Sequence, residues 1–177
     1  MLDTEAGLER ALAIAYRYLS PRERTQAEMR AHLQGKGIDE RDTERSIRAL
    51  AEQGHLDDAR FARLFVQDKR ELDQWGADRI RQVLLARGLD PDVAEAALAE
   101  HEHGHEHEQG HEHGHEHEED SGGEIGRALA VLRRRFPSPS GDRRERERAL
   151  GVLLRKGYDS DLALEAIAAH IRGPDAS

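Results

Sequence analysis

The sequence predicts an all-α protein made of three tandem three-helix repeats, which together form an elongated, curved molecule. Three observations favour this fold class. Ala, Glu, Lys, Leu and Arg supply 92 of the 177 residues, and a share of about half is typical of helical proteins. Apolar residues recur every three or four positions, the period of a helix with one buried face. One short pattern also occurs three times along the chain.

The repeated pattern runs from an apolar residue to a Leu four positions on, then a basic residue, a Gly, a large apolar residue and an Asp. Its glycines are Gly37, Gly88 and Gly157. The Leu lies on the buried face of a helix, and the basic residue suits its last turn. Gly supplies the left-handed conformation that ends the helix, and Asp caps the next helix. Each copy therefore predicts two helices joined by a tight turn.

A further helix precedes each of these pairs. The apolar residues that we expect to face inward from it are Leu8, Leu12, Ala15 and Leu19 in the first copy, Phe61, Phe65 and Leu72 in the second, and Ile125, Leu129, Leu132 and Phe136 in the third. Downstream of the glycines, Ile47, Leu98 and Ile167 should also point inward. Helix starts are predicted at Ser20–Glu23, as a capping box, and at Asp142–Glu145.

The glycine spacing sets the domain boundaries. Gly37 and Gly88 are 51 residues apart, whereas Gly88 and Gly157 are 69 apart. The difference matches an insertion between the second and third copies. We expect repeats at 5–55, 57–100 and 124–172, separated by an insert at 101–123. Each repeat is marginal alone, and stacking on neighbours would complete its core.

The insert is a tract of His, Glu and Gly. Residues 101–120 hold eight of the 11 His and eight acidic residues, with no basic residue. Without apolar side chains, nothing offsets the entropy of ordering the tract, so we expect a disordered insert. Its imidazoles could also gather Ni²⁺, Cu²⁺ or Zn²⁺. A metal-buffering role therefore stays open beside a purely solvated linker.

Several classes of protein are disfavoured by composition. No Cys is present, which excludes disulfides, thiol nucleophiles and Cys-ligated metal sites. The longest apolar run has six residues, 11–16, so we expect no membrane span. The first five residues lack the basic and apolar regions of a secretory signal, and we expect a cytoplasmic protein.

No reactive centre stands out. Gly35-Lys36-Gly37 lacks the spacing of a phosphate-binding loop, and Asp57-Asp58 is best interpreted as a helix cap. His32, His55 and His170 lie far apart in the sequence and form no ligand set. We therefore expect no enzyme activity, no cofactor and no metal site.

Basic residues form clusters at corresponding turns of the second and third copies. They are Lys69, Arg70, Arg79 and Arg81, then Arg133, Arg134 and Arg135, then Arg143 and Arg144. Arg outnumbers Lys 24 to 3, and guanidinium groups bind carboxylates and phosphates well. These nine residues are the candidate partner-binding residues, and ordinary solvated helix faces are the alternative.

The sequence resembles the RecX regulatory protein family. The resemblance rests on Tyr16–Thr25 with Leu33-x-x-Lys36-Gly37, and on Leu56–Ala62 with Trp75–Ile80 and Leu85–Gly88. It covers residues 8–172 apart from the tract, which departs from the family pattern. The resemblance implies three tandem three-helix repeats.

The same resemblance implies the function. Members of the family bind the RecA recombinase filament on DNA and modulate it, usually by inhibition, in DNA repair and the SOS response. We therefore expect a monomeric regulator of RecA, with weak direct DNA contact as a secondary expectation. The alternative is a helical nucleic-acid-binding protein that acts through its Arg clusters.

Overall fold

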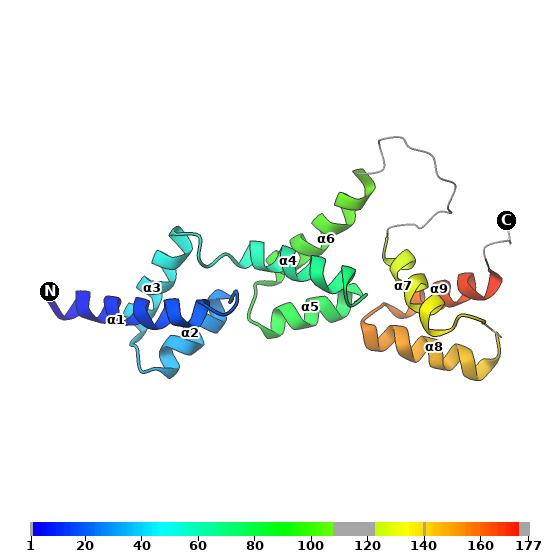
Figure 1. Ribbon diagram of the computed structural model, residues 1–177, viewed down its shortest axis with the longest axis horizontal. Coiled ribbons are helices and arrows are strands. Elements are labelled where there is room, and N and C mark those ends of the chain that lie inside the picture. Colours follow the sequence, from blue (N-terminus) through cyan, green and yellow to red (C-terminus); the bar gives the residue numbers. More distant parts are fainter. Residues whose placement is uncertain (1, 108–122, 140, 174–177) are drawn as a thin grey trace. The chain divides into compact units, whose positions relative to one another are not determined.

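The computed structural model describes residues 2–107, 123–139 and 141–173, and within these ranges all regular structure is helical (Figure 1). The helices follow the three predicted copies in order. They are α1 (Leu2–Leu19), α2 (Gln26–Gly35), α3 (Glu40–Glu52), α4 (Asp58–Glu71), α5 (Ala77–Ala86), α6 (Pro91–His107), α7 (Glu124–Arg135), α8 (Arg143–Lys156) and α9 (Ser160–Arg172). The predicted all-α fold class is confirmed.

The chain divides into two compact units. One comprises Met1–Leu64 with Leu84–Glu95, and the other comprises Phe65–Val83 with Ala96–Ser177. The helices α4, α5 and α6 therefore each contribute residues to both units.

The core of the first unit lies between α1, α2 and α3, which contact one another pairwise. Ala11 and Ala15 of α1 are fully buried, as are Leu33 of α2 and Leu50 of α3. The predicted Leu12 and Leu19 pack against this cluster only in part, because small alanines let α1 approach its neighbours closely. Ile47 is buried as predicted.

The start of α2 differs from the prediction. The capping box lies at Thr25, whose hydroxyl accepts from the N–H of Glu28 at 3.1 Å, while the Glu28 carboxylate accepts from the N–H of Thr25 at 3.2 Å. Ser20–Arg22 forms a turn instead. Both segments fit the Ser/Thr-x-x-Glu pattern, but Thr25 also donates its hydroxyl to the carbonyl of the distant Arg87, which favours Thr25 as the cap.

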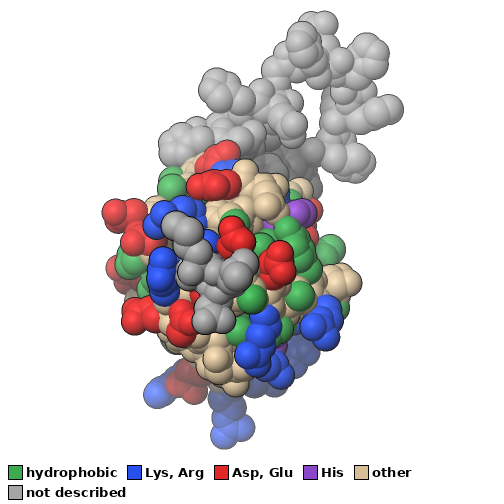
Figure 2. Space-filling model, turned by 90° about the vertical axis from the view of Figure 1, so that its left-hand side faces the viewer, with side chains coloured by type: hydrophobic (Ala, Val, Ile, Leu, Met, Phe, Trp, Pro, Cys, Tyr) green, Lys and Arg blue, Asp and Glu red, His purple; other side chains and the backbone are tan. Residues whose placement is uncertain are grey.

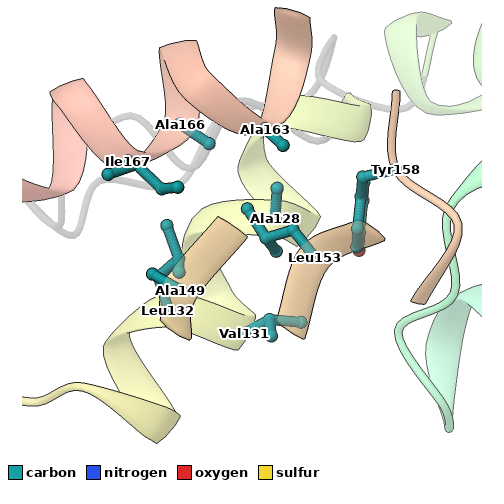
Figure 3. Close-up of a cluster of buried hydrophobic side chains, with 9 residues drawn as sticks. All are labelled: Ala128, Val131, Leu132, Ala149, Leu153, Tyr158, Ala163, Ala166 and Ile167. Carbon is teal, nitrogen blue, oxygen red and sulfur yellow. The ribbon is translucent and has the colours of Figure 1, made fainter. Parts of the chain in front are cut away.

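The second unit contains the core of the third copy (Figure 3). Ala128, Val131 and Leu132 of α7 face Ala149 and Leu153 of α8 and the buried side of α9. Ile167 is buried as predicted. Asp142 caps α8 by accepting from the N–H of Glu145 at 2.8 Å, which confirms the predicted helix start.

Two expectations about the middle copy are wrong. Leu72 is 77% exposed, because α4 ends at Glu71 and Leu72 lies beyond its buried face. That face is formed by Ala62, Val66 and Arg70, spaced four apart. In addition, α6 continues to His107, so 101–107 is helical rather than disordered as we expected. Residues 108–122 of the tract lie outside the described residues.

Candidate interaction surface

Two of the predicted basic residues meet at Trp75 in the second unit. The Lys69 ammonium lies 5.0 Å from the centre of the Trp75 ring, and the Arg79 guanidinium lies 4.0 Å from it. Lys69 also pairs with Asp73 at 2.6 Å, and Arg79 donates to the Arg155 carbonyl at 2.9 Å. Cations held over an aromatic face keep their charge in a fixed position. We call Lys69, Trp75 and Arg79 the Trp75 cluster.

A third cation, Lys156, lies beside the Trp75 cluster, although its sequence position did not predict this. The Lys156 ammonium donates to the Asp73 carbonyl at 2.6 Å. Burial lowers the pKa of Lys156, and the nearby charges of Arg134 and Arg79 lower it further, against the opposing effect of Asp73. Like charges therefore lie close together here, and an anionic partner would reduce the repulsion between them. The sequence predicted Lys156 only as the basic residue at a helix end.

Arg70 does not belong to the surface. Its side chain is 1% exposed, and its guanidinium lies 3.4 Å from the His101 ring. The expectation of a surface residue is therefore wrong for Arg70. The reason is its position on α4, one turn beyond the buried Val66, whereas Lys69 is half-buried and Glu71 is exposed.

The remaining candidates lie on α5, α7 and α8. Arg81 pairs with Asp78 at 2.6 Å. Arg133, Arg134 and Arg135 are exposed in the last turn of α7. Arg143, 89% exposed, pairs with Glu147 at 2.9 Å, and Arg144 is exposed. On the face drawn in Figure 2, basic and acidic side chains are intermixed.

The side chains considered for chemistry have structural roles. Asp57 accepts from the N–H of Arg60 at 2.9 Å and so caps α4, as predicted. Asp58 accepts from the N–H of Gln26 at 2.9 Å, at the start of α2. Within the described ranges, no three His or acidic side chains are grouped to hold a metal ion, and no described helix is long and apolar enough to cross a bilayer.

Comparison with known proteins supports the resemblance. The family models for the first and second three-helix domains of RecX match residues 11–50 and 57–98. The regulatory protein RecX of Mycobacterium ulcerans is 31% identical over 166 residues, 92% of this chain and 86% of that protein. The chain belongs to the RecX family. It is a family of regulatory proteins rather than a known enzyme family.

Other relatives of this RecX chain agree. The RecX protein of Lactobacillus delbrueckii subsp. bulgaricus is 38% identical over 100 residues, and the chain covers only 36% of its length. The crystal structure of RecX from Lactobacillus salivarius has a TM-score of 0.74 at 20% identity, covering 95% of this chain and 98% of that one. A second RecX structure gives 0.69. These structures show the same fold.

Proposed function

We propose that this RecX chain binds the RecA recombinase filament and inhibits it, as a regulator in DNA repair and the SOS response. Membership in the RecX family over most of the chain carries the proposal. The Trp75 cluster and the exposed Arg133–Arg135 supply cations that an acidic surface of a partner could bind. Contacts spread over several helical units would add affinity through their high effective concentration.

Inhibition can be measured as single-stranded-DNA-dependent ATP hydrolysis by RecA while the protein is titrated in. We expect the rate to fall at a substoichiometric ratio of this protein to RecA. An unchanged rate, together with no cosedimentation with RecA filaments, would overturn the proposal. A competing excess of free DNA tests the alternative, because a protein that acts by binding DNA would lose its effect.

A matched pair of triple variants tests whether Arg133–Arg135 belong to the surface that binds RecA. Replacing Arg133, Arg134 and Arg135 by Ser should weaken inhibition several-fold. The control replaces Arg10, Arg41 and Arg48, which are also exposed, and removes the same charge. Equal inhibition by both variants would show that the last turn of α7 is not part of the docking surface.

A further inference from the structure

In each copy, a helix ends just before the repeated Gly. In two of the three copies, the start of another helix packs against this helix end. In the first unit, Thr25 at the start of α2 donates its hydroxyl to the Arg87 carbonyl at 2.9 Å. The Glu28 carboxylate accepts from the Arg87 guanidinium at 2.9 and 3.0 Å. The side chain of Ala27 lies directly against Gly88. We call this arrangement a joint.

The second unit contains a corresponding joint one repeat further along, in which Arg79 takes the place of Glu28. Thr25 and Gly76 occupy the same place in the repeat, as do Arg87 and Lys156. The N–H of Gly76 donates to the Lys156 carbonyl at 2.9 Å, and the N–H of Asp78 donates to the Gly157 carbonyl at 3.1 Å. In both joints the carbonyl oxygens at a helix end accept from groups in the first turn of a helix.

The corresponding surface of the first copy, at Lys36 and Gly37, is uncovered. Both residues are exposed. An added side-chain carbon at Gly37 would meet nothing within 4 Å, whereas at Gly88 and Gly157 it would collide with the joint partner. Within the part of the chain that the structure describes, no group donates to the carbonyl of Lys36 or Gly37. The surface thus keeps the acceptors and the cation of a joint.

We propose that the Lys36–Gly37 end of α2 binds the first turn of a helix in a partner protein. The joint at Gly88 defines what that turn must carry. A small residue at its second position would lie against Gly37, as Ala27 lies against Gly88. A carboxylate at the third position would pair with Lys36, as Glu28 pairs with Arg87. The inference does not depend on the recombinase being that partner.

Charge argues against two other occupants. Exposed carbonyls at a helix end carry partial negative charge, so they favour N–H donors and disfavour the phosphates of a nucleic acid. In a second copy of the chain, the helix that corresponds to α2 and α5 in the third repeat is α8, and its first turn is not in a joint within the described residues. That turn has Arg144 at its second position, which would bring a large guanidinium against Gly37 and beside Lys36.

The test uses a fluorescent peptide with the sequence of residues 20–35, the segment that fills the joint at Gly88. A lactam bridge between positions 30 and 34, made by Arg30→Lys and Gln34→Glu, holds it helical, since short free helices are marginal in water. Fluorescence polarisation with the full chain should show saturable binding. Lys36→Glu should weaken it at least tenfold, and Glu28→Lys in the peptide should restore binding to that variant.

Arg48→Glu, an exposed reversal on α3, is the matched control and should leave peptide binding unchanged. Absence of saturable binding, or binding that Lys36→Glu does not alter, would overturn the proposal. So would concentration-dependent self-association in sedimentation that Lys36→Glu abolishes, because the occupant would then be a second copy. None of these readouts involves RecA, so the outcome is separate from that of the proposed function.

Discussion

The three repeated glycines share a backbone conformation but not an environment. Gly37, Gly88 and Gly157 have φ of 74°, 81° and 87°, which confirms the predicted left-handed helix ends. Only Gly88 and Gly157 also have a neighbouring helix pressed against the α-carbon. The repeat pattern alone predicts that changes at the three sites behave alike, whereas the structure predicts larger losses of stability at Gly88 and Gly157 than at Gly37.

We expect Gly37→Ala to cost about 1–2 kcal/mol of unfolding free energy, the penalty for a left-handed non-glycine residue. Gly88→Ala and Gly157→Ala should each cost about 1–3 kcal/mol more, because the new methyl group collides with Ala27 or with the backbone of Arg79. Urea unfolding of the three variants measures this. Equal losses at all three positions would contradict the joints.

Glu28 should make stability depend on pH. Burial alone would raise its pKa, but the hydrogen bonds from Arg87 and Thr25 and the charges of Arg87 and Arg24 lower it below its usual value. The folded pKa is therefore below the unfolded pKa. The resulting stability is fully present above the unfolded value, near pH 4.5, and is lost as the pH falls through the folded value.

Glu28→Gln should therefore cost about 1–3 kcal/mol at pH 7, typical for a hydrogen bond to a charged group, and progressively less in acid. The control is Glu44→Gln, whose pair with Arg30 is exposed and should be worth under about 1 kcal/mol. Denaturant unfolding from pH 7 to pH 3 compares them. A Glu28→Gln loss that does not shrink in acid would exclude this ion pair as its source.

Burial also distinguishes two of the candidate basic residues, Arg70 and Arg81. Arg70→Glu should destabilise the fold strongly, by about 3 kcal/mol or more, because it places a carboxylate in a site that is 1% exposed. Arg81→Glu, at a half-buried surface position, should cost under about 1 kcal/mol. Thermal melting ranks the two variants, and the opposite ranking would contradict the assigned face of α4.

At the scale of elements, the length of α6 determines how much of the His/Glu tract can be deleted without loss of stability. Its described part reaches His107, and His101 lies beside the buried Arg70. Deleting 108–120 should leave the melting temperature within a few degrees, since that segment contains no Leu, Ile, Val or Phe. Deleting 101–120 should lower it further, because the Arg70 contact is lost. Circular dichroism melts of both deletions would decide, and equal melting temperatures would show that His101–His107 stabilises nothing.

At the scale of the whole molecule, the two compact units share three helices. Because α4, α5 and α6 contribute to both units, neither unit can unfold while the other keeps all its helices. We therefore expect one cooperative transition. Trp75, the sole Trp, reports from the second unit, and circular dichroism reports from all helices. The two signals should coincide in denaturant, including for Gly88→Ala in the first unit. Two separate midpoints would show independent units.

The sequence by itself determined the helical class, the three copies, the glycine-terminated helix ends and the Asp caps. These are local properties, since a left-handed Gly or a capping carboxylate acts within a few residues of chain. The family also followed from local motifs. Ile47, Leu98 and Ile167 were predicted correctly because helical periodicity fixes which side faces the core.

Only the tertiary structure decided which polar side chains are buried or paired. Thr25 rather than Ser20 caps α2, because Thr25 also reaches the distant Arg87 carbonyl. Arg70 is buried and Lys156 joins the Trp75 cluster through contacts between segments more than 30 residues apart. Spacing along one helix carries no information about such contacts, because they depend on which turn of another helix lies opposite. For the same reason, the uncovered end at Gly37 is indistinguishable in sequence from the covered ends at Gly88 and Gly157.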